Sequence, residues 1–152
     1  MINNTINNKT NNNFFALLAS TLVLVSSNVW ADSHDVYGTF YTKDQGSKIE
    51  ITDCGNNSPC GKVVWVNPNT LDEGVKAQDL RSKAGEPILG LEIVKGFKRK
   101  KNDWRGGTIY DPKKDKTYAS RMKKLENGSL EVKGCISFFC ITQIWTEAPP
   151  QE

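Results

Sequence analysis

Eight short runs rich in β-branched and aromatic residues, separated by polar turns, constrain the fold of this chain most strongly. Apolar and polar residues alternate within several runs, as at residues 48–53 and 129–135, so one face of each run is expected to be buried. The pattern predicts an all-β protein with strands at residues 36–42, 48–53, 61–66, 91–98, 104–110, 117–125, 129–135 and 140–147.

Nearly all of the connections are of hairpin length, and Asn127-Gly128 is a dipeptide that strongly indicates a tight hairpin turn. Short connections make consecutive strands antiparallel neighbours. Eight such strands can close into an up-and-down barrel without exposed edges, whereas a sandwich needs strands that cross between two sheets. We therefore expect an eight-stranded antiparallel up-and-down barrel, with the two-sheet sandwich as the alternative.

One connection is much longer, because residues 67–90 separate the third and fourth predicted strands. Thr70 and Glu73 have the spacing of a helix capping box, and Gly85 is suited to end a short helix. A connection of this length in a compact domain is usually a functional lid or a packed loop. We expect a long loop or short helix that either covers a ligand entrance or simply closes one end of the barrel.

The four cysteines form two closely spaced pairs, Cys54 with Cys60 and Cys135 with Cys140, each between consecutive predicted strands. In an up-and-down barrel these two turns lie at opposite ends, roughly 23 Å apart along a seven-residue strand, whereas bridged α-carbons lie within about 7 Å. The strand order therefore predicts a disulfide within each pair. The same distance excludes one shared zinc site, and neither pair has the two-residue spacing of a redox motif.

The first 31 residues have the pattern of a secretory signal peptide. One charge, Lys9, precedes an apolar run at residues 14–25, and cleavage is expected after Ala31. The apolar run is shorter than the about 20 residues of a spanning helix, with a retained anchor as the alternative. Residues 32–152 are then expected to form a single β-barrel domain in an oxidising compartment, periplasmic or secreted, where disulfides persist.

Net charge gives little indication of a partner. Lysine and arginine number 20 and aspartate and glutamate 17, and removal of Lys9 leaves 19 minus 17, a net charge of +2. This excess is too small to indicate a nucleic-acid-binding protein. A basic rim at one end of the barrel is either a contact for an envelope protein or membrane surface or a set of solvated turns; it comprises Lys98, Arg99, Lys100, Lys101, Lys123 and Lys124.

A set of short motifs spans nearly the whole of residues 32–152. They are Gly38-Thr39-Phe40, Cys60-Gly61-Lys62-Val63-Val64-Trp65, Leu80-Arg81 with Pro87-Ile88-Leu89-Gly90-Leu91, Gly106-Gly107-Thr108-Ile109-Tyr110-Asp111-Pro112, Lys116-Thr117-Tyr118, and Gly134-Cys135 with Cys140-Ile141-Thr142-Gln143-Ile144-Trp145. Together they resemble a family of exported bacterial proteins, domain-of-unknown-function family 2147. Asp115 stands where that family usually has glycine, and Asp tolerates the left-handed conformation of such a turn. The resemblance implies a small lipocalin-like barrel and no agreed activity.

Alternation along the strands also predicts which side chains face the barrel interior. An eight-stranded barrel is either filled by side chains or just wide enough to hold one small ligand. Lys95 would need a carboxylate from Asp53 or from a ligand such as a fatty acid, unless a bulge at Gly96 turns it outward. We expect either a packed core or an apolar ligand pocket lined by Trp65, Lys95, Phe97, Trp104, Tyr110 and Tyr118.

The sequence contains no recognisable catalytic arrangement. His34 is the single histidine and precedes the first predicted strand, so neither a Ser/His/Asp triad nor a histidine metal site is expected within the chain. No spacing singles out a pair of carboxylates, and no cofactor is expected. We expect non-catalytic binding of an apolar or amphiphilic small molecule, such as a lipid. The alternative is a packed-core module that binds another envelope protein.

Cleavage after Ala31 is directly testable. Intact-mass measurement of the protein recovered from its native compartment is expected to give a chain that starts at Asp32, because the preceding apolar core is too short to remain as a spanning helix. A mass that includes residues 1–31 would show that the segment is retained.

Overall fold

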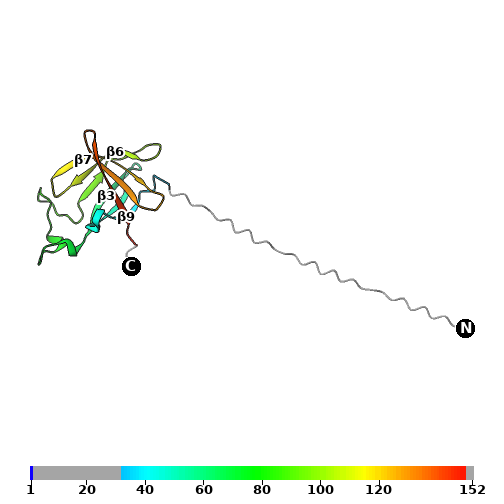
Figure 1. Cartoon of the computed structure of the whole chain (residues 1–152), viewed down its shortest axis with the longest axis horizontal. Coiled ribbons are helices and arrows are strands. Elements are labelled where there is room, and N and C mark those ends of the chain that lie inside the picture. The colour runs from blue at the N-terminus through cyan, green and yellow to red at the C-terminus, as the bar shows by residue number, and fades with distance from the viewer. Residues whose placement is uncertain (2–31, 150–152) are drawn as a thin grey trace.

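The computed structural model describes residue 1 and residues 32–149, and its strands wrap into a barrel (Figure 1). The predicted signal peptide lies outside the described residues. The strands are β1 (Gly38–Tyr41), β2 (Ser47–Asp53), β3 (Pro59–Val66), β4 (Glu92–Lys95), β5 (Lys98–Arg99), β6 (Trp104–Asp111), β7 (Lys116–Lys124), β8 (Leu130–Ile136) and β9 (Phe139–Glu147).

Eight of these strands form the closed antiparallel barrel that the hairpin spacing predicts. The order β4-β3-β2-β1-β9-β8-β7-β6 is closed by pairing of β4 with β6, and the short β5 adds to β6. The alternative of two stacked sheets is thereby excluded. Asn127 and Gly128 lie in the turn between β7 and β8, where the Asn127 side chain accepts a hydrogen bond from the Ser129 N–H at 3.0 Å.

The predicted fourth strand is interrupted at Gly96. This residue has φ +77, a left-handed conformation that glycine adopts without strain, and it separates β4 from β5. β4 therefore pairs with β6 through two residue pairs only, Val94 with Ile109 and Lys95 with Thr108. The barrel closes through a very short contact.

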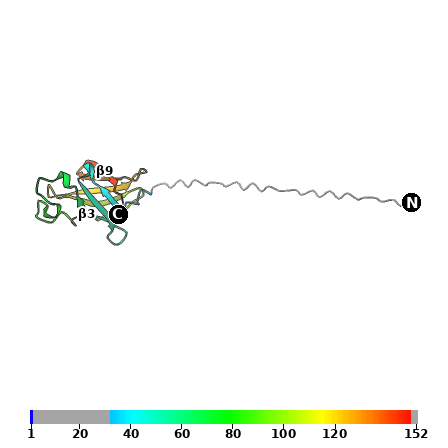
Figure 2. The same ribbon diagram turned by 90° about the horizontal axis from the view of Figure 1, so that it is seen from below.

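The long connection contains two 3₁₀ turns, η2 (Pro68–Thr70) and η3 (Ala77–Asp79), and a third, η1 (Lys43–Gln45), follows β1. The capping box expected at Thr70 does not form, because the Asn67 side chain caps η2 by accepting from the Asn69 N–H at 3.0 Å. Figures 1 and 2 both place this connection at the end of the barrel opposite to residue 32.

The end near residue 32 is closed by the chain itself. Val36 is fully buried, and the Trp104 indole N–H donates to the His34 carbonyl at 3.0 Å. The His34 ring is 2.6 Å from the Lys100 carbonyl and 3.1 Å from an Asp32 carboxylate oxygen. The segment before β1 thus seals this end, and a ligand would have to approach from elsewhere.

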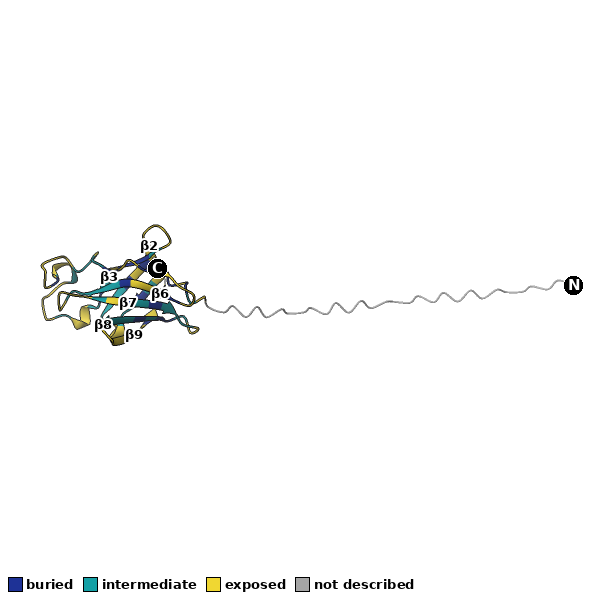
Figure 3. Cartoon of the chain, turned by 90° about the horizontal axis from the view of Figure 1, so that it is seen from above, coloured by how far each residue is buried: buried dark blue, intermediate teal, exposed yellow. Residues whose placement is uncertain are grey.

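The interior of the barrel is packed with large buried side chains. Figure 3 colours the buried residues of the strands dark blue. Phe40, Phe97, Trp104 and Trp145 are each 2 % exposed or less. Full burial of such side chains stabilises the fold by about 1.5–3 kcal/mol each. This part of the interior is therefore a core.

Both disulfides have the local connectivity that the strand order predicts. Cys54 is bonded to Cys60 across the β2–β3 hairpin, with α-carbons 5.7 Å apart. Cys135 is bonded to Cys140 across the β8–β9 hairpin, with α-carbons 4.0 Å apart. The two bridges thus lie at opposite ends of the barrel.

Gly107 is required by packing. A β-carbon at this position would lie 2.3 Å from the Phe97 ring, so Gly107→Ala is expected to lower the free energy of unfolding by about 1–3 kcal/mol through overpacking. Gly46→Ala is the control, because nothing lies within 4 Å of the added atom and the φ of −73 suits alanine. Urea denaturation of both variants checks this; equal stability would show that the ring is free to move.

Candidate functional site

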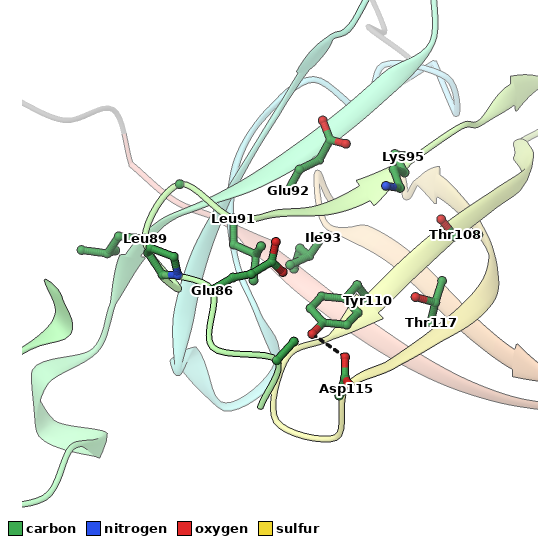
Figure 4. A pocket seen from close by; sticks show the side chains of 13 residues that line it. Glu86, Leu89, Leu91, Glu92, Ile93, Lys95, Thr108, Tyr110, Asp115 and Thr117 are labelled. Carbon is green, nitrogen blue, oxygen red and sulfur yellow. Dashed lines mark hydrogen bonds between the residues drawn. The ribbon is translucent and has the colours of Figure 1, made fainter. Parts of the chain in front are cut away.

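A pocket of about 610 Å³ lies beside the β4–β6 contact, between the long connection and the β6–β7 hairpin (Figure 4). Its apolar lining comes from the connection and β4, and its polar lining comes mainly from β4, β6 and the hairpin turn. The apolar residues are Ala84, Pro87, Leu89, Leu91 and Ile93 with Gly90, and the polar ones are Glu86, Glu92, Lys95, Thr108, Tyr110, Asp115 and Thr117.

The pocket lies on the outer face of the barrel wall. Val94 is fully buried in the interior, and it pairs with Ile109 of β6. Ile109 also faces the interior, because a β-carbon added at Gly134 on the interior face would contact it. Neighbouring residues of a strand point to opposite faces. Lys95 and Thr108, the next register pair, therefore point outward into the pocket.

The long connection covers this part of the outer face. Residues 84–91 lie beside β3, where the Val63 N–H donates to the Leu91 carbonyl at 3.0 Å, and Lys83 donates to the Pro112 carbonyl of the β6–β7 turn at 2.8 Å. Ile93, which lines the pocket and also belongs to the buried apolar cluster, is 7 % exposed. The covering segment thus forms one wall of the pocket.

The polar lining has an uneven charge distribution. Among the described residues, the Lys95 ammonium makes no salt bridge, so its charge is available to a ligand. The Tyr110 hydroxyl donates to an Asp115 carboxylate oxygen at 2.9 Å. Partial burial and this hydrogen bond raise the pKa of Tyr110, so the phenol is neutral near pH 7. Glu86 adds a second carboxylate on the side of the connection.

Trp65 does not face the interior, contrary to the prediction from alternation. The register between β2 and β3 shifts after Lys48, so that Lys48 pairs with Trp65 and Ile49 pairs with Val63. The extra residue in β3 moves Trp65 to the outer face, where its ring lies 5.9 Å from the Tyr41 ring and 5.3 Å from the Lys48 ammonium.

Tyr110 and Lys95 also face outward instead of inward. A register shift between Arg105 and Gly107 places the extra residue at Gly106, which has φ +74, and exchanges the faces of the following residues. Lys95 is turned outward next to the bend at Gly96, which is the alternative that the sequence offered. Among the described residues Lys95 makes no salt bridge with Asp53, and both Lys95 and Tyr110 line the outer pocket.

The remaining candidates, Phe97, Trp104 and Tyr118, do face the interior. Phe97 and Trp104 are fully enclosed in the core, whereas Tyr118 is half-buried beside Gly134. The structure therefore does not bring the six predicted ligand-binding residues together. Leu89, Leu91 and Thr117 line the pocket but were not among the predicted ligand-binding residues, and the long connection was the available signal for Leu89.

The predicted basic rim is only partly exposed. Lys98 to Lys101 are exposed, and Arg99 lies 3.4 Å from Asp32. Lys124 is instead packed over the Phe40 ring at 4.7 Å and pairs with Glu147 at 3.4 Å. The described residues carry one group with metal-ligand spacing, Cys54 with Cys60 and Glu92, and both of its cysteines are in a disulfide.

The comparisons agree with this architecture. A family model described as "Uncharacterized protein conserved in bacteria (DUF2147)" matches residues 38–147. The chain belongs to the DUF2147 family. No curated protein matches the sequence of this family member. A solved structure with a TM-score of 0.60 and 18 % identity, covering 76 % of this DUF2147 chain and 84 % of its own, is described as "Protein HP1028 from the human pathogen Helicobacter pylori belongs to the lipocalin family".

At this identity the likeness establishes the fold, so the DUF2147 barrel described above is lipocalin-like. The strand order follows the short hairpin connections of the chain, and the long connection follows β3. In the part of the DUF2147 chain that the structure describes, no helix has the length and apolar character needed to cross a membrane.

Asp115 is expected to control the titration of Tyr110. Asp115→Asn removes the charge that disfavours the phenolate, so the Tyr110 pKa should fall toward its ordinary value of 10.0. Ultraviolet absorbance during pH titration measures it, with Tyr110→Phe to identify the transition and Asp111→Asn as a control in the same turn. Because the raised pKa means that the folded state holds the Tyr110 phenolic proton more tightly than the unfolded state, the contribution of this proton to stability is lost as pH rises above about 10. An unchanged pKa in Asp115→Asn would contradict the hydrogen bond.

Proposed function

We propose that this protein is exported and binds a small amphiphilic molecule, without catalysis, in the outer pocket between β4 and the β6–β7 hairpin. The observation that carries the proposal is an apolar strip, Leu89, Leu91 and Ile93, that faces the same space as an ammonium without an ion partner among the described residues. Apolar surface supplies affinity and a few polar groups fix orientation in most small-molecule sites.

The charges of the lining indicate the kind of head group. Lys95 attracts one negative charge, and the hydroxyls of Thr108 and Thr117 offer hydrogen bonds beside it. Glu86 and Asp115 disfavour a second negative charge at the other side of the pocket. The lining therefore suits an amphiphile with one anionic group, such as a fatty acid, better than a phosphate diester with further acidic groups.

Export is supported by the two disulfides and by the signal-like first 31 residues. The absence of catalysis is supported by the position of His34, whose two ring nitrogens lie against Asp32 and the Lys100 carbonyl at the sealed end of the barrel. That imidazole is therefore far along the barrel from the pocket and occupied by structural contacts.

The packed-core module is a second candidate, which the filled interior favours. If Phe97 and Trp104 serve stability alone, the protein acts through its surface and needs no ligand. The two functions differ in whether the outer pocket takes up a small molecule. A binding experiment on the pocket separates them.

Lys95→Gln is expected to weaken decanoate binding by about tenfold, because a charge-assisted hydrogen bond contributes about 1.5 kcal/mol, and to leave decanol binding unchanged. Glu86→Gln should strengthen decanoate binding by removing a repulsion. Lys98→Gln is the matched control, since it removes the same charge three residues away and outside the pocket. Isothermal titration calorimetry measures decanoate and decanol binding by the wild type and the three variants.

Equal decanoate affinity in the wild type and Lys95→Gln would refute the site, and no saturable binding of either probe would favour the packed-core module.

A further inference from the structure

The apex of the β8–β9 hairpin carries an unusual group of exposed apolar side chains. Ile136 is 61 %, Phe138 96 %, Phe139 84 % and Ile141 73 % exposed, and together they define the apolar apex. Soluble proteins rarely present such side chains contiguously unless the surface contacts a partner or a membrane. Figure 3 shows the exposed start of β9 beside β8.

The exposure follows from strand pairing. β8 pairs with β7 no further than Cys135, and β9 pairs with β1 only through Thr146 and Glu147. Between these points the two strands of the hairpin pair only with each other, with Ile136 opposite Phe139, and η1 lies beside β9. The Cys135–Cys140 disulfide closes the base of the hairpin, so the apex is held in an extended hairpin.

Lysines from the neighbouring β6–β7 turn lie at the same level as the apex. Ala119 pairs with Cys135, so Lys116 and Phe138 each lie three residues farther toward this end of the barrel. Lys113 and Lys116 are exposed and make no salt bridge among the described residues, whereas Lys114 pairs with Asp111 at 3.6 Å. Asp115, between them, is engaged by Tyr110.

We propose that the apolar apex inserts into the boundary between head groups and acyl chains of an anionic lipid bilayer, with Lys113 and Lys116 contacting lipid phosphates. A narrow hairpin with aromatic side chains at its tip and cations beside it matches the two layers of a membrane surface, an apolar interior under a negatively charged plane. The lipid surface explains both the apolar side chains and the unpaired lysines. The site lies at the end of the barrel opposite to the basic rim, and it shares the β6–β7 turn with the outer pocket, although neither Lys113 nor Lys116 lines that pocket.

The test is co-sedimentation of the oxidised protein, residues 32–152, with vesicles of phosphatidylcholine alone or mixed with phosphatidylglycerol. The wild type is expected to bind the mixed vesicles and to release as salt is added. Phe138→Ser with Phe139→Ser should lower the partition coefficient by at least about tenfold through loss of apolar insertion. Lys113→Gln with Lys116→Gln should lower it several-fold on the mixed vesicles only.

Lys98→Gln with Lys100→Gln is the matched control, because it removes two charges at the opposite end and is expected to leave binding unchanged. Urea unfolding checks that the serine variant is folded, and Phe138→Ser alone serves if the double variant is not.

Three results would overturn the proposal: no binding to mixed vesicles, loss of binding only in the control, or equal binding to both vesicle types. Lipid-independent self-association of the wild type that the serine variant abolishes would also overturn it, by showing that the apex binds a second copy. Decanoate binding by the serine variant is expected to remain normal, because neither Phe138 nor Phe139 lines the outer pocket, so failure here leaves the ligand pocket untouched.

Discussion

Three of the strand contacts around the barrel are very short, and the other features of the molecule depend on two of them. β4 pairs with both β6 and β3, and β1 with β9, through two residue pairs each, whereas the β2–β3, β6–β7 and β8–β9 hairpins each pair through seven. A strand left unpaired over part of its length exposes backbone and side chains that must be covered or must contact something else. Both regions to which we assign a function lie beside one of these contacts.

The two sites differ in what covers them. Beside the β4–β6 contact, residues 84–91 fold over the outer wall and leave a partly enclosed pocket that contains the Lys95 ammonium. Beside the β1–β9 contact η1 lies next to β9, and the apolar apex of the hairpin is left exposed. Both sites depend on the packed interior, because burial of Phe97 and Trp104 stabilises a barrel whose wall is incompletely paired.

Hairpin spacing was sufficient to predict the strand order and the local disulfides, since each depends on short connections and on the length of a strand. Alternation correctly placed Phe97, Trp104 and Tyr118 in the interior, but it failed for Trp65 and Tyr110. One extra residue in a strand reverses every later side chain, and bulges at Val64 and Gly106 did so here. The Gly106-Gly107 pair indicated irregular backbone, but sequence alone does not show which glycine is extra and which is required by the Phe97 ring.

The central claim is that a ligand binds in the barrel wall and not in the barrel interior. Nuclear magnetic resonance of the ¹⁵N-labelled protein titrated with decanoate tests this most directly, because the Trp104 and Trp145 indole N–H groups report on the core. Binding in the barrel wall predicts saturating shifts at the backbone of Lys95, Thr108 and Thr117 with both indole signals unchanged. Shifts of the indole signals together with Tyr118, and none at Lys95, would contradict it by placing the ligand inside the barrel.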